Sequence, residues 1–338
     1  MRVGLAGYGL AGRHIHRPQL KAAGFEIASV STSNPERMAE VESDEPQAQV
    51  VPDLDALLQV PDLDLIVLAT PTGMHVDHLR AAIAAAVPIV VDKPITPDAA
   101  SAQQAVAAAA AAGCPLTVFQ NRRWDTPHLA AKKLLADGSL GDLVRYEFRW
   151  ERWRPEPKAR WREQDSAADG GGLLLDLGAH LVDSAVDLFG PVDSVVATMA
   201  SHTTAAEDEV VMMCRHTGGV VSHLSTTSLA GVPGPRLRLS GTKAAYVVTE
   251  FEAEPNGLPG FENPAGHVGW LCRADDREAL PTVAPERTFY EQVADALNSD
   301  DPQAKMPVDP RDSVHVARVL DAARRSAQNW QVTQVEGP

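Results

Sequence analysis

An aspartate and a histidine four residues apart form the pair in this chain best suited to acid–base chemistry. Asp176 and His180 follow Gly170–Gly172 and fall where a helix is predicted to start. At this spacing both side chains face one way. A neutral imidazole can take a hydroxyl proton, and a carboxylate beside it can fix its tautomer and help pass the proton onward. The spacing alone is equally typical of a surface ion pair, or of Asp176 acting as a helix N-cap.

A glycine-rich turn near the first residue predicts the binding of a dinucleotide. It follows an apolar strand and opens a helical pattern, which is the context that gives G-x-G-x-x-G its meaning. The first glycine permits the tight turn, the second lets the backbone approach a pyrophosphate, and the third allows helix and strand to pack closely. The turn reads Gly7-Tyr8-Gly9-Leu10-Ala11-Gly12.

The residues after the second predicted strand favour NADP over NAD. NAD sites usually place an acidic residue about 20 residues beyond the glycines, to bind the ribose 2′-hydroxyl. Here Ser31, Thr32 and Ser33 occupy that place. Their small hydroxyl side chains leave room for a 2′-phosphate, and Arg37 can supply positive charge. The alternative is that these residues only cap the helix predicted from Pro35.

The elements that position these groups divide the chain in two. Up to about residue 120, short β-rich runs alternate with helical patterns, which predicts a doubly wound parallel sheet of the Rossmann type. The predicted strands and helices are Arg2–Ala6, Gly12–Ala23, Glu26–Ser31, Pro35–Glu42, Leu54–Leu58, Leu65–Ala69, Val76–Ala85, Ile89–Val91, Asp98–Ala112 (with Gly113 as C-cap) and Leu116–Phe119.

The remainder, residues 121–338, reads as an α+β domain with a large, mostly antiparallel open sheet. A helix near His128–Leu135 precedes a strand at Val144–Trp153, and strand-like segments run from Val192 to Thr249. Helices return at Thr288–Leu297 and Asp312–Ala327, the second with an apolar stripe. We expect residues 1–120 to bind the dinucleotide and residues 121–338 to bind substrate and to oligomerise.

Composition narrows the class of protein. A chain of 338 residues with 44% hydrophobic and 22% charged residues can bury a sizeable core in two domains. Its net charge of −15, without a basic run, argues against nucleic acid and membrane partners. The widely spaced Cys114, Cys214 and Cys272 suggest neither disulfides nor a zinc site. With no signal-peptide pattern and no run of 18 apolar residues, we expect a cytoplasmic protein.

Five segments together resemble one family, that of glucose-fructose oxidoreductase, inositol dehydrogenase and MocA, over nearly the whole chain. Within it, the later segments look most like NADP-dependent scyllo-inositol dehydrogenases and their relatives. The five segments are GYGLAGRHIHRP (7–18), ATPTGMHVDH (69–78), VDKPIT (91–96), QNRRWD (120–125) and GGGLLLDLGAHLVD (170–183).

The resemblance implies three catalytic residues, Lys93, Asp176 and His180. The family usually has Glu-Lys-Pro where this chain has Asp92-Lys93-Pro94, and its lysine reaches both substrate and nicotinamide. A lysine at the carboxyl end of a parallel strand lies where such sheets place ligands. Within the family motif, Asp176 and His180 form the proton relay, and Asp183 assists from behind.

Further residues are implied to line the two binding sites. Thr70, Pro71, Thr72 and His75 should lie near the nicotinamide ribose, although His75 can equally begin the next helix as a solvated residue. Dense donors and aromatic faces suit a polyol, although each arginine alone can be a surface ion pair. The candidates for substrate binding are Lys93, Asn121, Arg122, Arg123, Trp124, Arg152, Trp161, Arg162, Asp176 and His180. The remaining histidines show no ligand spacing, and we expect no metal.

These implications predict an NAD(P)-dependent oxidoreductase that moves hydride between a secondary alcohol of a cyclic polyol or sugar and nicotinamide, with NADP favoured. Two alternatives are a glycoside hydrolase that retains NAD and a non-catalytic dinucleotide-binding regulator. The intact Lys93, Asp176 and His180 argue against the regulator. We also expect a homodimer or homotetramer formed through the outer face of the second sheet, where segments such as Val210–Cys214 and Val220–Ser225 are apolar.

Overall fold

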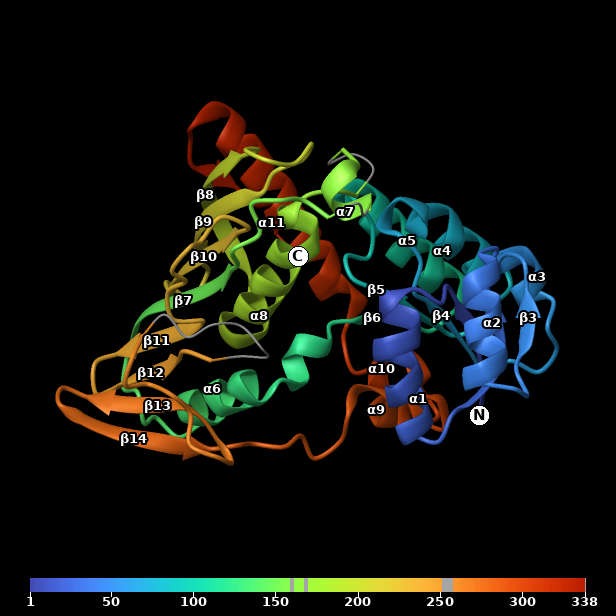
Figure 1. Ribbon diagram of the computed structural model, residues 1–338, viewed down its shortest axis with the longest axis horizontal. Helices are drawn as coiled ribbons and strands as arrows, with labels where there is room; N and C mark the ends of the chain where they lie inside the picture. Colours follow the sequence, from blue (N-terminus) through green and yellow to red (C-terminus); the bar gives the residue numbers. More distant parts are fainter. Residues whose placement is uncertain (159–160, 167–169, 251–257, 338) are drawn as a thin grey trace. The chain divides into compact units, whose positions relative to one another are not determined.

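A computed structural model describes residues 1–158, 161–166, 170–250 and 258–337. The chain divides into two compact units. The first contains residues 1–120 and 287–314, and the second contains residues 121–286 and 315–338. Each unit has its own sheet and its own hydrophobic core. Figure 1 shows the two sheets.

The first unit is built on a six-stranded parallel sheet in the order β3-β2-β1-β4-β5-β6. This order is that of a Rossmann fold, with the switch point between β1 and β4. The predicted parallel sheet is confirmed, and β3 is an additional strand that the sequence pattern did not reveal. The strands are β1 (Arg2–Ala6), β2 (Glu26–Ser31), β3 (Gln49–Val51), β4 (Leu65–Leu68), β5 (Ile89–Asp92) and β6 (Leu116–Phe119).

Helices flank this sheet (Figure 1), and several of them begin at a side-chain N-cap. The alanine-rich helix α5 begins after the N-cap Asp98 and ends at Gly113, which has a left-handed φ of 62°. The helix predicted from Gly12 starts as a π-helical turn before continuing as an α-helix. The helical elements are η1 (Gly12–His16), α1 (Arg17–Ala22), α2 (Pro35–Asp44), α3 (Leu54–Leu58), η2 (Thr72–Met74), α4 (His75–Ala84) and α5 (Ala99–Ala112).

Residues 287–314 return to the first unit late in the chain. The division predicted at residue 120 assigned everything that follows to the second domain, whereas this segment packs with the first unit. It contributes α9 (Phe289–Leu297), α10 (Pro302–Lys305) and the start of α11 (Pro310–Asn329). The side-chain amide of Gln303 accepts from the backbone N–H of Leu116 through Oε1 and donates to its carbonyl oxygen through Nε2. The Thr117 hydroxyl donates to the carbonyl oxygen of Val308 at 2.8 Å. These bonds cover the outer edge of β6.

The second unit is built on a nine-stranded sheet in the order β14-β13-β12-β11-β7-β10-β9-β8-β15. Among the described strands of this sheet, only β7 and β10 pair in parallel, so the sheet is mostly antiparallel, as predicted. The strands are β7 (Leu143–Glu151), β8 (Val192–Ala200), β9 (Glu209–His216), β10 (Val221–Thr227), β11 (Leu237–Gly241), β12 (Ala245–Val248), β13 (His267–Arg273), β14 (Asp276–Pro281) and β15 (Thr333–Gln334).

Helices cover one face of this sheet (Figure 1). Residues of α6, α8 and α11 form one buried cluster with the inward side chains of the strands, among them Val182, Val319 and Tyr146. The opposite face carries exposed apolar side chains, including Val211 and Met213, which are 44% and 47% exposed. The helical elements are η3 (Asn121–Trp124), α6 (Thr126–Ala136), α7 (Trp161–Gln164), η5 (Leu174–Gly178) and α8 (Ala179–Phe189), with the rest of α11.

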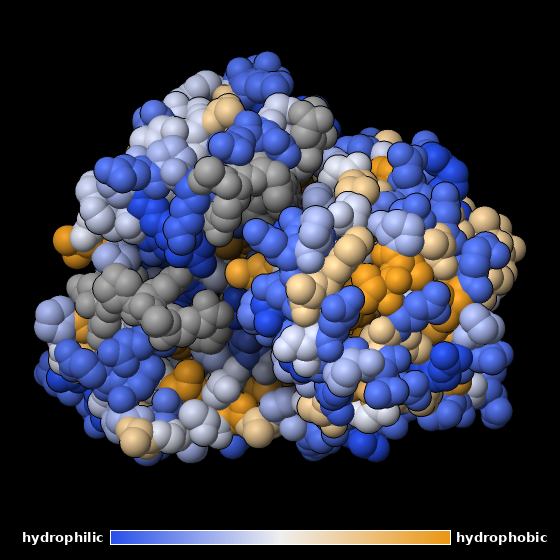
Figure 2. Space-filling view, turned by 45° about the vertical axis from the view of Figure 1, so that its right-hand side comes forward, coloured by the Kyte–Doolittle hydropathy of each residue, from blue (hydrophilic) through white to orange (hydrophobic). Residues whose placement is uncertain are grey.

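Polar residues cover most of the molecular face in Figure 2, in keeping with the net charge of −15. Cys114, Cys214 and Cys272 are free thiols. No helix among the described residues has the length and apolar character needed to cross a membrane.

Candidate functional site

The glycine turn of the first unit has the geometry that its sequence predicts. Gly7 has a φ of +94°, and a Cβ there would lie 2.7 Å from the carbonyl oxygen of Ala69. A Cβ on Gly12 would lie 2.1 Å from the carbonyl oxygen of Gly7. Both positions therefore exclude a side chain. Tyr8 points into the core instead, where its hydroxyl donates to Asp44 at 3.1 Å.

A cation lies beside the middle glycine of this turn. A Cβ on Gly9 would lie 3.8 Å from three guanidinium atoms of Arg37. The bare backbone of Gly9 and this guanidinium together offer donors suited to a phosphate group. The residue that caps α2 is Asn34, whose Oδ1 accepts from the backbone N–H of Arg37 at 3.0 Å. The exposed Ser33 is therefore not required as the cap of α2.

His75 is not the solvated residue that one reading of the sequence allowed. Its side chain is fully buried at the start of α4, with Nδ1 2.9 Å from the carbonyl oxygen of Pro94 and Nε2 2.9 Å from that of Thr70. Burial lowers the pKa of His75, which favours the neutral ring, and a neutral imidazole can donate only one of these bonds. His75 thus connects the loops that follow β4 and β5. Thr70 also contacts His78, at 2.9 Å.

Lys93 follows β5 and is half-buried, at the carboxyl end of a parallel strand. Its backbone N–H donates to Oδ1 of Asp92 at 2.8 Å. Burial alone would raise the pKa of Asp92, but the contact with His16 and the positive charge of Lys93 lower it to about 2. The carboxylate is therefore ionised at neutral pH.

In the second unit, cations gather around one buried tryptophan. The guanidinium carbons of Arg122, Arg152 and Arg236 lie 4.9, 5.1 and 3.8 Å from the centre of the Trp150 ring. The ring of His180 lies 5.7 Å away on α8, and only 7% of His180 is exposed. The structure thus places two of the predicted substrate-binding arginines at the same aromatic side chain as the predicted base.

Asp176 lines a pocket together with Arg152. The pocket contains about 500 Å³ of empty space, including space open to solvent, and it lies within the second unit. Glu207 lines it too, and its carboxylate accepts from the backbone N–H of Leu174 at 3.1 Å. Gly172 has a φ of +93°, which explains why the turn before Asp176 favours glycine. Burial raises the pKa of Glu207.

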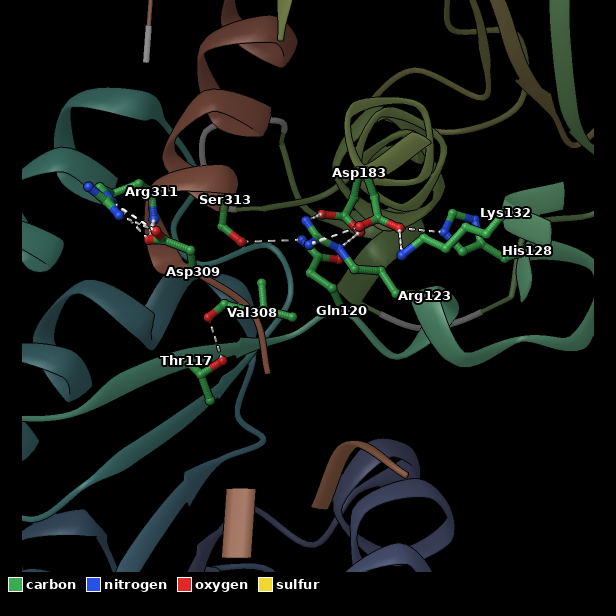
Figure 3. A network of polar contacts seen from close by, with 11 residues as sticks. Thr117, Gln120, Arg123, His128, Lys132, Asp183, Val308, Asp309, Arg311 and Ser313 are labelled. Carbon is green, nitrogen blue, oxygen red and sulfur yellow. Dashed lines mark hydrogen bonds and ion pairs between the residues drawn. The ribbon is translucent and has the colours of Figure 1, made fainter. Parts of the chain in front are cut away.

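Arg123 belongs to a buried ion network rather than to this pocket (Figure 3). Its Nε and Nη2 donate to the two carboxylate oxygens of Asp183 at 2.9 and 2.7 Å, and its Nη1 lies 3.4 Å from Asp187. Asp187 also contacts His128 at 2.5 Å and Lys132 at 2.6 Å. Burial raises the pKa of Asp183, whereas the contacts of Asp187 outweigh burial and lower its pKa. The network ties η3 and α6 to α8.

The other predicted residues are less informative. Asn121 and Trp124 are half-buried in η3. Trp161 and Arg162 begin α7, but their side chains lie outside the described residues. Throughout the described ranges, no three His, Cys, Asp or Glu side chains come together as a metal site would require.

Several residues near these groups were missed by sequence reasoning. Trp150 and Arg236 come together from β7 and the segment before β11, and Glu207 reaches the turn before Asp176 from the strand connection after β8. His16 and Tyr290 contact each other close to Asp92 although 274 residues separate them. No local pattern reports such long-range neighbours, although His16 lies within the segment 7–18 that carries the family resemblance.

Two family models match most of the chain. The model described as an oxidoreductase family with an NAD-binding Rossmann fold matches residues 1–120. The model of the GFO/IDH/MocA C-terminal domain matches residues 128–247.

Individual relatives match along nearly the whole length. A scyllo-inositol 2-dehydrogenase (NADP(+)), IolW of Bacillus subtilis, is 30% identical over 99% of this chain and 96% of its own. An inositol 2-dehydrogenase of an Arthrobacter species is 34% identical over 43% of this chain and 43% of its own. Among solved structures, yvaA of Bacillus subtilis, described as an oxidoreductase, is 30% identical, with a TM-score of 0.86 over 99% of this chain and 98% of that one.

Proposed function

The chain belongs to the Gfo/Idh/MocA family of oxidoreductases, and on that premise we propose that it oxidises a secondary alcohol of a cyclic polyol or sugar with NADP, in a reversible reaction. The dinucleotide-binding fold and the activity on CH–OH groups come with the family. The observation that carries the finer proposal is the arrangement at the glycine turn, where Arg37 lies beside Gly9 and no acidic residue ends β2.

NADP is favoured by the chemistry of the residues after β2. Ser31, Thr32 and Ser33 replace the acid that would repel a 2′-phosphate. Because Asn34 caps α2, the exposed Ser33 hydroxyl is available to a ligand. The guanidinium of Arg37 supplies a charge that a 2′-phosphate would pair with. The name of IolW also specifies NADP.

The residues that would act on the substrate divide the work. Bound nicotinamide would supply the hydride acceptor, since the redox chemistry belongs to the cofactor. His180 takes the hydroxyl proton as general base, and Asp176 stabilises the resulting imidazolium. Because Asp176 lines a pocket that is open to solvent, the proton can leave by that route. Lys93 donates a hydrogen bond to the reacting oxygen and favours its alkoxide character.

A polyhydroxylated substrate suits the polar groups of the second unit. The pocket that holds Asp176 mixes cations such as Arg152 and Lys158 with carboxylates such as Glu163 and Glu207. Carboxylates accept hydrogen bonds from hydroxyl groups, and guanidinium groups donate to them. The buried ring of Trp150 beside His180 packs against the guanidinium groups of Arg122 and Arg152 and so supports these two donors.

We further propose that the open face of the nine-stranded sheet mediates a homodimer or homotetramer. Apolar side chains are exposed there, and an open face of this kind needs cover. Val211 and Met213 are directed to this face by the strict alternation of buried and exposed residues along β9. A monomer in light scattering at micromolar concentration would contradict this proposal.

A substrate panel tests the proposed activity. Inositols, aldoses and ketoses should each be assayed with NADP and with NAD, following absorbance of the reduced cofactor. We expect turnover with a cyclic polyol and higher kcat/KM for NADP. Cofactor retained through purification together with glycoside cleavage and no net reduction would identify the hydrolase instead. Dinucleotide binding without turnover of any alcohol would identify a regulator.

A further inference from the structure

A buried histidine connects the glycine turn to the residue beside Lys93. His16 is the last residue of the π-helical turn η1, which begins at Gly12, and its side chain has no exposed surface. Its Nδ1 lies 2.6 Å from the hydroxyl of Tyr290, and its Nε2 lies 3.7 Å from Oδ2 of Asp92. The other oxygen of Asp92 accepts from the backbone N–H of Lys93. All four residues belong to the first unit.

The chemistry of the three groups fixes the direction of the hydrogens. Asp92 is ionised, so the ring nitrogen that faces it carries the proton, and Nε2 has no other partner among the described residues. With the hydrogen on Nε2, Nδ1 accepts from the Tyr290 hydroxyl. Burial raises the pKa of Tyr290 well above its ordinary value, so the hydroxyl keeps its hydrogen. Tyr290 thereby holds the ring in the orientation that directs Nε2–H at Asp92.

We propose that His16 and Tyr290 are positioning residues for Lys93, which act by holding the Asp92 carboxylate in place. The proposal rests on the assignment of Lys93 to the reaction made above. The family usually has glutamate where this chain has Asp92, and the shorter side chain has less reach of its own. Contact from His16 compensates for the shorter reach of the Asp92 side chain. A fixed carboxylate then orients the backbone of Lys93 and sets the charge that its ammonium experiences.

The surroundings of Asp92 contain few other groups that could take over this role. His75 is the other titratable side chain near it, and both of its ring nitrogens already contact backbone carbonyl oxygens. Phe119 stacks against the rings of His16 and Tyr290, with centroids 4.2 and 5.7 Å away, and offers no hydrogen bond. The polar groups facing Asp92 are therefore His16, His75, Lys93 and, through His16, Tyr290.

The reactivity of the Lys93 amine measures this coupling without requiring turnover. The folded protein is labelled with trace acetic anhydride across a pH series, and the Lys93 peptide is quantified by mass spectrometry against exposed Lys133. When His16 is removed, Asp92 loses one of its partners, and its negative charge stabilises the ammonium of Lys93 more strongly. The labelling midpoint of Lys93 should then rise by about half a pH unit. Below the midpoint, the fraction of free amine should fall about threefold. Asp92→Asn should move it in the opposite direction.

The variants separate positioning from general loosening of the fold. His16→Leu removes the donor, whereas His16→Gln returns an amide N–H near the position of Nε2 and should restore most of the wild-type behaviour. Tyr290→Phe removes the contact that holds the ring and should move the midpoint in the same direction as His16→Leu. Tyr246→Phe is the matched control, because Tyr246 is a buried tyrosine of the second unit whose hydroxyl donates to the carbonyl oxygen of Val268. It should leave the Lys93 midpoint unchanged.

Kinetics provide the second reading. His16→Leu and Tyr290→Phe should lower kcat about 10- to 100-fold, the range for residues that orient a reacting group, with little change in the KM for the dinucleotide.

An unchanged Lys93 midpoint in folded His16→Leu, or equal effects of Leu and Gln, would overturn the proposal. If the wild type oxidises no alcohol, the proposed function fails, and the labelling pattern still decides whether His16 acts on Lys93 through Asp92. If Tyr290→Phe does not fold, the Leu and Gln pair at His16 carries the test.

Discussion

Two polar clusters, one in each unit, are held in different ways. At the ends of β4 and β5 in the first unit, His75 contacts the backbone carbonyl oxygens of Pro94 and Thr70. Between η3 and α8 in the second unit, side chains hold one another, as in the pairing of Arg123 with Asp183. A site formed by nearby backbone groups can be predicted from a short sequence pattern, whereas a site formed by distant side chains cannot. The consecutive arginines Arg122 and Arg123 show this, since one contacts Trp150 and the other a buried carboxylate.

The largest expected effect breaks the side-chain network. Arg123→Ala leaves Asp183 buried and unpaired, so we expect a loss of about 3 to 5 kcal/mol in the free energy of unfolding. Arg80→Ala is the control, because Arg80 and its partner Asp77 are both exposed, and it should lose about 1 kcal/mol or less. Urea unfolding at pH 7 measures both. Equal losses would mean that the two arginines are not distinguished by burial.

The next effect concerns catalysis. His180→Ala and Lys93→Ala should each lower kcat at least about 100-fold, the low end for a lost acid–base group, with dinucleotide affinity nearly unchanged. The wild-type oxidation rate should rise with pH as the general base loses its proton. The exposed His202 provides the control variant His202→Ala. Near wild-type turnover of His180→Ala would remove His180 from its assigned role.

A smaller effect tests cofactor choice at the glycine turn and the residues after β2. Ser33→Asp would place a carboxylate against the 2′-phosphate, and a repulsion of about 1 to 3 kcal/mol would weaken NADP about 5- to 150-fold while sparing NAD. The kcat/KM ratio of the two cofactors, in wild type and variant, is the quantity to measure. Arg37→Ala should likewise hurt NADP selectively. A wild-type preference for NAD, or an unmoved ratio, would refute the NADP assignment.

The smallest effect is a pH dependence on the open face of the second sheet. Glu147 is buried, yet its hydrogen bonds with Arg238 and Arg149 outweigh burial and lower its pKa to about 2. A lowered pKa stabilises the fold above the unfolded-state value and loses that stabilisation as pH falls through the folded one. The stability gap between wild type and Glu147→Gln should thus be constant above about pH 5 and close toward pH 2. Urea midpoints at pH 7 and pH 3 test this, and a gap that widens on acidification would contradict it.

Sequence reasoning succeeded where structure is local. The bounds of β1, β2 and β6, the cap at Gly113 and the conformation of the glycine turn all follow from short patterns. It missed β3, a strand of three residues, and it left open which residue caps α2. The role of Arg123 could not be predicted, because its partner Asp183 lies 60 residues away. The local sequence does not distinguish an arginine in a pocket from one in a buried ion pair.

The late return of residues 287–314 has a consequence for biosynthesis. The ribosome completes the strands of the first sheet at Phe119, but Tyr290 and Phe289, which pack on His16 and Phe119, emerge about 170 residues later. At 5 to 20 residues per second, that delay is about 10 to 30 s. During this interval the nascent first unit exposes an apolar surface and lacks the hydroxyl that orients His16. A fragment ending at residue 120 would remain in that unfinished state, so the smallest autonomous version of this unit must include its C-terminal segment.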